Sequence, residues 1–393
     1  MVVEADSETE PITIDEIKTI AKKKLSKQAW DYYITGVGPE LTLQRNEAIF
    51  DKLFLRPRVL RNVSGVDTTT TIFGKRYAFP VAIAPSAYQK LCHENGEVAM
   101  SRAARKLGTN FILSSNATTS MEEVMQESPA STAQAPNFWF QLYVLRNRAV
   151  AAELIRKAET AGYEALCVTV DTPIMGNRLH ERRAPMTLPP HLTRANLSTE
   201  KGSGSSKIRL VLTAKTAAEA KRISEQHSAN LNDDTLTWEE FIPWLKAQTK
   251  LKIVLKGVLT AEDALLAAEL GVDGIVVSNH GGRQLDGVPS TLETLPEIAA
   301  AVKGRIPVVF DGGITKGSDV FKALALGADL CLIGRSALWG LAYKGQEGVE
   351  DVLHLLERDL WRTMVLMGAR SVQQISRDML GVAKKDDFGI AKL

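Results

Sequence analysis

The amino-acid sequence predicts an α/β fold, a (β/α)8 TIM barrel, from two observations. Eight short apolar segments recur along the chain, and segments with the periodicity of amphipathic helices lie between them. Near-continuous hydrophobic runs are typical of strands buried on both faces, as in a parallel sheet covered by helices. Eight alternating strand–helix units close into a barrel. The alternative, an open doubly wound sheet, is disfavoured because no G-x-G-x-x-G motif follows the first strand.

The other elements are predicted from periodicity and capping residues. Residues 12–35 have the pattern of a helical segment before the barrel, and residues 345–378 that of long helices closing it. Thr260, and Ser290 with Glu293, predict capped helix N-termini because each precedes an acidic residue by three positions. The eight predicted strands cover residues 80–84, 110–114, 138–143, 165–170, 252–256, 273–278, 306–311 and 329–334.

The spacing of the strands predicts one barrel domain over residues 12–380, with residues 1–11 disordered and residues 381–393 as a tail. Between the fourth and fifth strands the spacing is much longer, because residues 185–250 intervene. This insertion contains the glycine- and serine-rich stretch 198–207, "STEKGSGSSK". Long insertions of this kind are lids or disordered excursions. We therefore predict a partly disordered lid over the barrel mouth.

Composition and charge exclude several classes of protein. The net charge of +2 and the lack of a basic run give no reason to expect a nucleic-acid partner. No apolar segment approaches the roughly 20 residues that span a bilayer, so no membrane association is expected. The three cysteines are expected to be free thiols. The final residues Ala391-Lys392-Leu393 are a conservative variant of the S-K-L peroxisomal signal, and we predict a peroxisomal location, with the cytoplasm as the alternative.

Polar side chains fall where the predicted strands end, which is where barrels of this type carry their chemistry. One such residue alone would be weak support for a functional site. Each of the eight predicted strands, however, ends in a polar residue or is followed by one. The residues are Ser86, Ser114, Ser115, Gln141, Tyr143, Thr169, Asp171, Lys256, His280, Arg283, Asp311 and Arg335.

The loops after the seventh and eighth predicted strands indicate a phosphate site. They contain Gly312, Gly313 and Gly334, followed by Arg335. Glycines let backbone N–H groups approach an anion closely, and arginine adds a charged, planar donor. These two loops are the usual phosphate site of such barrels. The ligand or cofactor is therefore expected to carry a phosphate.

Lys256 ends an otherwise apolar strand, and a buried lysine there must face an anion or lose its proton. Two roles remain open from the residues alone. The lysine could stabilise negative charge on a reduced flavin, or it could form a Schiff base with a carbonyl substrate.

The stretch "SNHGGRQLD", residues 278–286, predicts an acid–base site beside a carboxylate site. His280 suits a general base, and Arg283 offers a bidentate match to a carboxylate. The adjacent pair Gly281 and Gly282 would allow both side chains to face one pocket. Asp171, at the end of the fourth strand, is a candidate partner for the imidazole. This combination predicts an acid substrate that gives up a proton next to its carboxylate.

These motifs together resemble the FMN-dependent L-2-hydroxy acid oxidases and dehydrogenases, a family that includes glycolate oxidase, lactate oxidase and mandelate dehydrogenase. The resemblance covers about residues 12–380, and the histidine motif is highly specific. The matching stretches are "SNHGGRQLD", "VTVDTP", "VLKGV", "QLYV", "DGG" and "FKALALGADLCLIGR".

The resemblance implies a role for each matching residue, with FMN as the cofactor. His280 would be the base, Asp171 its partner, and Lys256 the cation near N1 and the C2 carbonyl of the flavin. The substrate would be bound by Tyr32, Tyr143, Arg178 and Arg283. The flavin ring would contact Ala84, Pro85, Ser86, Ala87, Ser114, Gln141, Thr169 and Ser278. The ribityl chain and phosphate would contact Asp311, Gly313, Gly334 and Arg335.

Two positions depart from the family pattern. Thr315 and Lys316 follow "DGGI" where family members usually have an arginine, and lysine lacks the planar fork of that residue. Asn116 replaces the tryptophan that glycolate oxidases carry two residues after the serine of "LSS". Asn116 would open and polarise the pocket, and Met175 is apolar and adaptable. Lactate or a larger 2-hydroxy acid is therefore predicted over glycolate.

We thus predict oxidation of an L-2-hydroxy acid to the 2-oxo acid, with reoxidation by O2 to give hydrogen peroxide. The two electrons could leave as a hydride or after a carbanion, and both routes stay open. A dehydrogenase with another electron acceptor is the alternative, and a Schiff-base lyase acting through Lys256 on a phosphorylated keto substrate is a more distant one. A homotetramer is expected from the family resemblance alone.

Overall fold

The computed structural model describes residues 10–129, 132, 137–197, 208–226, 232–384 and 389–393. The described residues form an eight-stranded parallel sheet with strand order β4-β11-β10-β9-β8-β7-β6-β5. An isolated parallel bridge from Ile83 to Phe111 joins β4 to the segment leading into β5 and closes the sheet into a barrel. The strands are β4 (Val81–Ile83), β5 (Ile112–Ser114), β6 (Trp139–Leu142), β7 (Ala165–Thr169), β8 (Lys252–Val258), β9 (Gly274–Val277), β10 (Val308–Asp311) and β11 (Leu330–Ile333).

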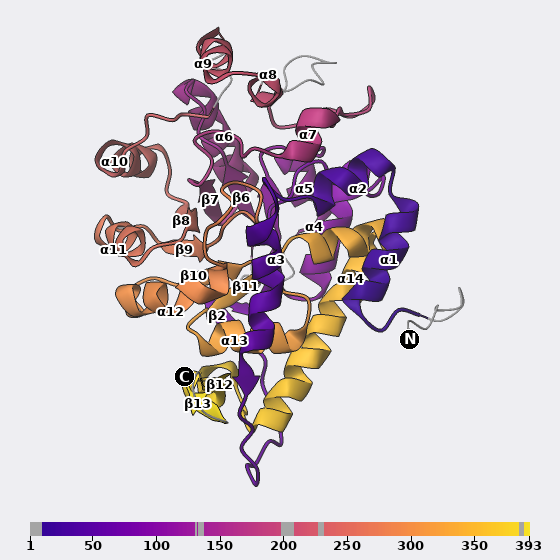
Figure 1. The fold of residues 1–393 in the computed structure, drawn as a ribbon, viewed down its shortest axis with the longest axis vertical. Coiled ribbons are helices and arrows are strands. Elements are labelled where there is room, and N and C mark those ends of the chain that lie inside the picture. Colours follow the sequence, from indigo (N-terminus) through magenta and orange to yellow (C-terminus); the bar gives the residue numbers. More distant parts are fainter. Residues whose placement is uncertain (1–9, 130–131, 133–136, 198–207, 227–231, 385–388) are drawn as a thin grey trace.

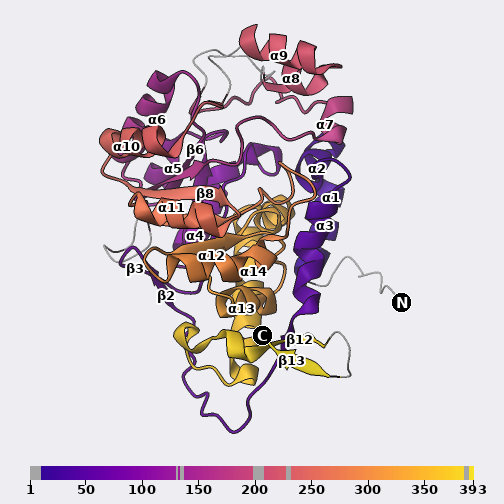
Figure 2. The same cartoon turned by 60° about the vertical axis from the view of Figure 1, so that its left-hand side comes forward.

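All eight strands begin and end within two residues of the predicted apolar runs, so the prediction of a barrel is confirmed. Helices surround the sheet on its outer face, and α11, α12 and α13 lie side by side along it (Figures 1 and 2). The surrounding helices are α4 (Gly96–Lys106), α5 (Met121–Glu127), α6 (Arg148–Ala161), α10 (Trp238–Gln248), α11 (Ala261–Glu269), α12 (Thr291–Val302), α13 (Gly317–Ala325) and α14 (Arg335–Met367).

The capping predictions hold at the two helices concerned. Ser290 accepts from the backbone N–H of Glu293, whose carboxylate accepts in return from the backbone of Ser290, so α12 begins with a complete capping box. Thr260 accepts from the backbone N–H of Asp263 at the start of α11. Each bond satisfies a donor that a helix N-terminus would otherwise leave open.

The barrel interior is packed, and one of its ends is closed. The inward-facing side chains, among them Trp139, Val254 and Leu332, form a buried hydrophobic cluster. The hairpin of β2 (Thr70–Ile72) and β3 (Lys75–Tyr77) adds Ile72 and Tyr77 to this cluster. Among the described residues, the barrel is therefore open to a ligand at the opposite end, where the strands have their carboxyl termini.

The predicted helical segment before the barrel is present as α1 (Ile14–Lys24), α2 (Lys27–Ile34), α3 (Leu41–Ala48) and the 3-10 turn η1 (Ile49–Lys52). Helix α1 packs along α14. Helix α14 extends to Met367 with a break at Lys344 and Gly345, whose backbone angles are not helical. Two 3-10 turns follow it, η4 (Val372–Gln374) and η5 (Arg377–Met379). Together these segments cover one side of the barrel from the carboxyl rim to the opposite end (Figure 1).

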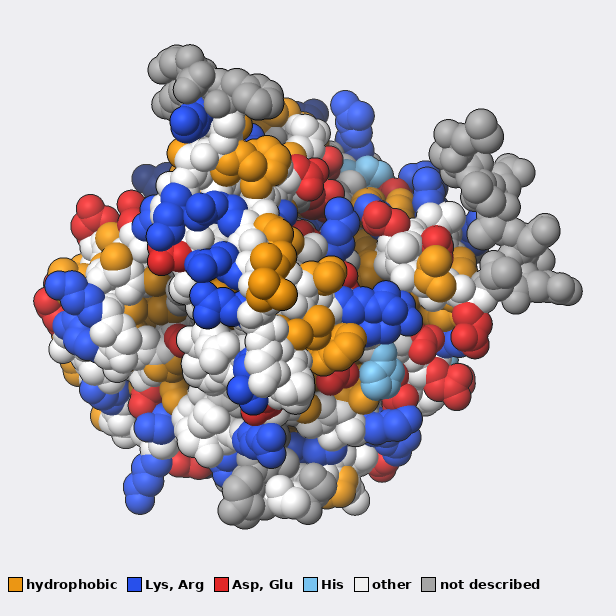
Figure 3. All heavy atoms as spheres, turned by 90° about the horizontal axis from the view of Figure 1, so that it is seen from below, with side chains coloured by type: hydrophobic (Ala, Val, Ile, Leu, Met, Phe, Trp, Pro, Cys, Tyr) orange, Lys and Arg blue, Asp and Glu red, His pale blue; other side chains and the backbone are white. Residues whose placement is uncertain are grey.

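The C-terminal residues pair with the start of the barrel domain. Strands β12 (Leu380–Ala383) and β13 (Ile390–Lys392) form a three-stranded antiparallel sheet with β1 (Phe54–Leu55). The residues predicted as a tail thus include two paired strands. Seen from this end of the molecule, basic, acidic and hydrophobic side chains are interspersed on the surface (Figure 3).

The predicted lid contains helices in its described part. These are α8 (Ile208–Thr213), α9 (Ala217–Gln226) and α10, with α7 (Leu179–Arg183) just before the predicted start. Helices α7, α8 and α9 lie at the end of the molecule opposite β12 and β13 (Figure 1). The glycine- and serine-rich stretch of the predicted lid, residues 198–207, lies outside the described residues, as do residues 227–231. Among the described residues, no helix combines the length and apolar character needed to cross a membrane.

Candidate active site

A cavity of about 570 Å³ opens at the carboxyl ends of the barrel strands. Every one of the eight strands delivers at least one residue to its wall, and α2 adds Tyr32 and Tyr33 from the side. Such convergence places groups that are far apart in sequence around one ligand. The strand-end residues in the wall are Ala84, Ser114, Gln141, Thr169, Lys256, His280, Asp311 and Gly334.

His280 lies at this rim between a carboxylate and a phenol. Its Nδ1 is 3.0 Å from Oδ1 of Asp171, and its Nε2 is 3.4 Å from the hydroxyl of Tyr143. The backbone of His280 has a φ of 58°, in the left-handed region that few non-glycine residues occupy. The backbone N–H donates to Oγ of Ser278, which helps to hold this conformation. Nδ1 donating to Asp171 leaves Nε2 as the acceptor that faces the cavity.

The surroundings of His280 keep its imidazole neutral. Burial lowers its pKa below 6.5, the positive charges of Lys256 and Arg178 lower it further, and the attraction to Asp171 only partly offsets these effects. Burial raises the pKa of Asp171, but His280 and Lys256 outweigh burial and bring the net pKa below its usual value. The pair is thus a neutral imidazole beside a carboxylate, which is the state required of a general base.

Three arginines approach the cavity beside this base. The guanidinium of Arg283 donates to the carbonyls of Tyr32 at 2.8 Å and Thr35 at 2.6 Å, and it lies 5.1 Å from the centre of the Tyr32 ring. Burial and the neighbouring charges of Arg178 and Arg335 lower the pKa of Arg283 to about 9. Crowded, buried cations of this kind are stabilised by an anion, and a carboxylate matches the fork of a guanidinium.

Glu181 is a charged group of this site that the sequence did not reveal. It lies on α7, is only 2% exposed, and its Oε1 is 3.0 Å from Nη1 of Arg178 and 3.9 Å from Nη2 of Arg283. The run "LHERR" has the composition of a solvated surface helix. Burial disfavours the charged form of Arg178, yet Glu181 raises the pKa of Arg178 above its usual value. Glu181 therefore holds Arg178 and Arg283, the two arginines that form the candidate carboxylate clamp.

Lys256 is held as a cation at the centre of the rim. Its Nζ lies 3.0 Å from Oδ2 of Asp311 and donates to Oγ of Ser278 at 2.7 Å. Burial lowers the pKa of Lys256, but the carboxylates of Asp311 and Asp171 outweigh it and raise the pKa well above its usual value. A fixed positive charge at this position can stabilise negative charge that develops on a bound group.

A network of hydrogen bonds fixes the amide of Gln141 in the wall of the cavity. Its Oε1 accepts from the backbone N–H of Ser115 at 3.2 Å, and its Nε2 donates to Oγ1 of Thr169 at 3.0 Å. Gln141 is 2% exposed. These bonds give the floor of the cavity a defined pattern of donors and acceptors.

The glycine-rich end of the cavity allows the backbone to approach a ligand closely. A Cβ atom at Gly313 would lie 1.9 Å from the carbonyl oxygen of Asn46, and φ is 78° there, so only glycine fits. Gly334 caps the N-terminus of α14. Arg335 lines the wall and donates to the carbonyls of Tyr33 and Gly281. Thr315 also lines the cavity, whereas Lys316 is not among the lining residues.

The residues of the cavity fit FMN. At one end, glycine backbones, Arg335 and a helix N-terminus provide a phosphate site. In the middle, Oδ1 of Asp311 is buried and has no hydrogen-bond partner among the described residues, so it can accept from a hydroxyl of the ribityl chain. At the other end, Lys256 and Gln141 can meet the polar edge of the flavin ring.

The structure brings nearly all predicted site residues to this one cavity. The exceptions are Ser278 and Asp171, which do not line the wall but lie directly behind Lys256 and His280. Ser278 is predicted to contact the flavin ring, and its Oγ accepts from the side chain of Lys256 and from the backbone N–H of His280. Sequence reasoning did not single out the carbonyls of Tyr33 and Thr35, because a residue of any type can supply a backbone acceptor.

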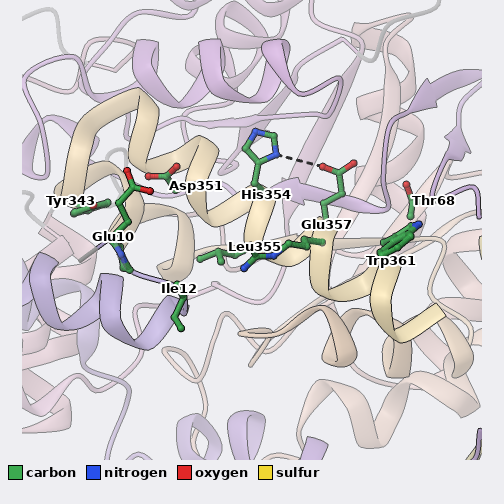
Figure 4. Close-up of a pocket in the computed structure, with 11 residues that line it drawn as sticks. Glu10, Ile12, Thr68, Tyr343, Asp351, His354, Leu355, Glu357 and Trp361 are labelled. Carbon is green, nitrogen blue, oxygen red and sulfur yellow. Dashed lines mark ion pairs between the residues drawn. The ribbon is translucent and has the colours of Figure 1, made fainter. Parts of the chain in front are cut away.

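A second hollow, of about 510 Å³, lies between residues 10–12 and α14. Figure 4 shows its lining, which includes Glu10, Asp351 and Trp361, with an ion pair of 3.6 Å between His354 and Glu357. No end of a barrel strand contributes to this hollow. It is therefore separate from the rim that carries the base and the clamp.

Comparison with known proteins agrees with this geometry. The sequence model described as FMN-dependent dehydrogenase matches residues 21–382. The chain is 44% identical over 371 residues to an L-lactate oxidase of Nostoc sp., covering 94% of this chain and 98% of that protein. It is 41% identical over 382 residues to 2-hydroxyacid oxidase 1 of Homo sapiens, covering 97% and 99% of the two chains. A solved structure of mandelate oxidase with (S)-4-hydroxymandelic acid matches with a TM-score of 0.83 at 38% identity, covering 97% of this chain and 100% of that one.

Proposed function

The chain belongs to the FMN-dependent dehydrogenase family, and on this premise we propose that it oxidises an L-2-hydroxy acid to the 2-oxo acid and passes the electrons to O2. One observation supports this proposal above the others. A neutral imidazole paired with a carboxylate, a buried cation and a cluster of arginines meet at one rim of the barrel. Relatives of the chain carry the names of 2-hydroxy acid oxidases, which supports the reaction class.

In the proposed reaction, the substrate carboxylate binds Arg283 and Arg178, with the hydroxyl of Tyr32 beside them. His280 takes one proton from the substrate through Nε2, and Asp171 stabilises the imidazolium that forms. The hydroxyl of Tyr143 hydrogen-bonds the substrate hydroxyl and keeps it directed at Nε2. Bound FMN supplies the two-electron acceptor, and Lys256 offers its charge to the polar edge of that group. The substrate loses two electrons and two protons in all, and both pairs end in hydrogen peroxide when O2 is the final acceptor.

The proposed substrate is lactate or a larger 2-hydroxy acid in preference to glycolate. Asn116 and Met175 line the cavity, and an asparagine leaves more space than the tryptophan of glycolate oxidases. The extra space accommodates a substrate side chain that glycolate does not have. Apolar methionine adapts to side chains of different shapes.

Anaerobic mixing of the flavin-loaded protein with L-lactate tests this function. The yellow absorbance of the flavin should bleach, and readmitted oxygen should restore it with formation of hydrogen peroxide. Bleaching that an artificial electron acceptor reverses but oxygen does not would identify a dehydrogenase. Failure of glycolate, lactate and mandelate alike to bleach the flavin would refute the proposed oxidation.

A Schiff-base lyase is the weaker candidate because the nucleophile would have to be neutral. The pKa of Lys256 is raised by Asp311 and Asp171 in spite of burial, so the amine carries a proton at every ordinary pH. Trapping of a borohydride-reduced adduct on Lys256 would favour the lyase over the oxidase.

The dependence of activity on pH should follow His280. Because burial, Lys256 and Arg178 lower the pKa of this base below 6.5, kcat/KM for L-lactate should be constant near neutral pH. It should then fall tenfold per pH unit as the pH drops below the lowered pKa, where the imidazole becomes protonated. Steady-state rates between about pH 4 and pH 9 measure this profile. An acidic limb whose midpoint lies above 6.5 would contradict the assignment.

We also propose a homotetramer and a peroxisomal location, with a cytoplasmic location as the alternative. Family resemblance supports the tetramer, which light scattering of the holoenzyme can measure. Ala391-Lys392-Leu393 support the location. Residues up to Lys392 pair with β12, and Lys392 forms an ion pair of 2.7 Å with Asp378, so a receptor would have to separate β13 from β12. Imaging an N-terminally tagged chain with and without the last three residues tests this signal.

A further inference from the structure

The turn that carries the base has an unusual backbone conformation. His280, Gly281 and Gly282 have φ angles of 58°, 63° and 73°, so three consecutive residues lie in the left-handed region. Glycine adopts this region readily, but a residue with a Cβ atom does so only at a cost in free energy. Contacts from the surrounding structure must therefore hold the turn, because the backbone at His280 decides where its imidazole points.

Asn279, the residue directly before this turn, is fixed by hydrogen bonds on both ends of its amide. Its Oδ1 accepts from Nδ2 of Asn46 at 2.8 Å and from the backbone N–H of Gly282 at 3.2 Å. Its Nδ2 donates to Oδ1 of Asn46 at 2.8 Å and to the carbonyl of Pro289 at 3.3 Å. These bonds use both donors and both acceptor positions of the amide, so its orientation is determined.

Asn46 joins this loop to a different part of the chain. It lies on α3, before the barrel, and exchanges both hydrogen bonds of its amide with Asn279. Asn46 is 2% exposed and Asn279 is 4% exposed, so water does not compete for these bonds. The other partners of Asn279, Gly282 and Pro289, belong to its own loop. The amide pair is therefore the contact that fixes Asn279 relative to α3.

Helix α3 is also held against the same loop by contacts that do not involve the amide pair. The carboxylate of Asp286 accepts from the backbone N–H groups of Leu41 and Thr42, at 3.2 Å and 2.7 Å, in the first turn of the helix. A Cβ atom at Gly282 would lie 2.7 Å from Cα of Leu43, so the turn and the helix touch through their backbones. These contacts should keep α3 in place when the amide pair is removed.

We propose that Asn46 is a positioning residue for His280, an inference that rests on the function proposed above. Through its amide pair with Asn279, Asn46 holds the turn in the left-handed conformation, and so directs Nε2 of His280 at the substrate. Asn46 itself takes no proton. A displacement of about 1 Å can lower the rate of an enzyme about a hundredfold, so loss of the pair should slow the reduction of the flavin.

Asn46→Ala tests this inference on the flavin-loaded protein. Stopped-flow absorbance during anaerobic mixing with saturating L-lactate gives a rate constant and an amplitude of bleaching, both expressed per bound flavin. The rate constant should fall by about 10- to 100-fold at full amplitude, because each molecule keeps its base but in the wrong place. A wild-type rate constant, at full or at reduced amplitude, would overturn the proposal, since reduced amplitude alone reports partial unfolding.

Asn46→Asp is the second variant, because it keeps the shape of the side chain. It replaces the donor that faces Oδ1 of Asn279 with an acceptor, so the pair loses one bond and gains a repulsion. Its rate constant should also fall by about tenfold or more. Bleaching of Asn46→Asp at the wild-type rate constant would contradict the role of the pair.

Asn46 also lines the cavity, so a double-mutant cycle is needed to show that it acts through Asn279. Asn279→Ala should be slowed at least as much as Asn46→Ala, since it also loses the bonds to Gly282 and Pro289. Adding Asn46→Ala to Asn279→Ala should then change the rate constant by less than about twofold. A further loss as large as that of Asn46→Ala alone would show that Asn46 acts by another route, and would overturn the proposal.

Arg45→Met is the matched control on the same helix. Arg45 is exposed, donates to the carbonyl of Val288 in the same loop at 3.3 Å, and does not line the cavity. Its rate constant should stay within about twofold of wild type, and a loss like that of Asn46→Ala would refute a specific role of the pair. Wild type that L-lactate does not bleach would count against the proposed function. Wild type that bleaches no faster than Asn46→Ala would remove only the role of Asn46.

Discussion

His280→Gln should retain FMN but lose the reduction of the flavin by L-lactate, with the rate of anaerobic bleaching lowered by about 10²–10⁴-fold. The glutamine amide can occupy the place of the imidazole near Tyr143 and Asp171, but it cannot take a proton. The phosphate and ribityl contacts come from other strands, so the cofactor should remain bound. Stopped-flow absorbance measures the rate, and the visible spectrum of the purified protein measures the flavin content.

His354→Gln is a suitable control for this substitution. His354 lies in the separate hollow on α14 and pairs with Glu357 at the surface. Its replacement should leave the rate of bleaching at the wild-type value. Bleaching of His280→Gln at the wild-type rate would show that the proton goes elsewhere, and Asp171 or Tyr143 would then have to be reconsidered.

Arg283→Met should lower kcat/KM for L-lactate by about 30-fold to several thousand-fold. Truncating one partner of a buried, hydrogen-bonded charge pair costs about 2–5 kcal/mol, and each 1.4 kcal/mol is a factor of ten. Arg283→Lys should recover only part of this loss, because an ammonium group cannot bind a carboxylate in a bidentate manner. Steady-state kinetics, together with the dissociation constant of a competitive 2-oxo acid, measures the effect.

The matched control is Arg182→Met, because Arg182 is an exposed arginine of α7 that contacts Asn177 and does not line the cavity. Arg182→Met should change kcat/KM by less than about twofold. A similar loss in both variants would point to a general effect of charge on substrate approach. A dissociation constant for the 2-oxo acid that is unchanged in Arg283→Met would exclude this arginine from the clamp.

The barrel could be predicted from the sequence because buried parallel strands have a simple signature. Residues 274–277 (GIVV) and 330–333 (LCLI) carry no polar side chain, and these runs become β9 and β11. The strand ends carry the chemistry, so the positions of Lys256, His280 and Asp311 followed from the same pattern. These residues meet because parallel strands all end at one rim.

Other features of the site depend on side-chain direction and on the backbone, which sequence patterns do not encode. Glu181 lies in a run of charged residues, yet it is buried and pairs with Arg178. Lys316 follows "DGGIT" in the region where family members usually have an arginine, and at the start of α13 it does not line the cavity. Arg194 lines the cavity but comes from the predicted lid, far in sequence from any strand end, where the backbone N–H of Ala195 donates to the carbonyl of Ala117.

The carbonyl of Thr35 accepts hydrogen bonds from both Arg283 and Arg335, at 2.6 Å and 3.4 Å. The turn after α2 therefore touches the acid-binding and the cofactor-binding halves of the cavity at once. Any displacement of this turn by one ligand changes the free energy of binding the other, and thermodynamics requires the effect to be equal in both directions. An inhibitory acid that stabilises this turn would then slow the dissociation of flavin. The flavin absorbance that remains after dialysis would therefore report occupancy of the acid site.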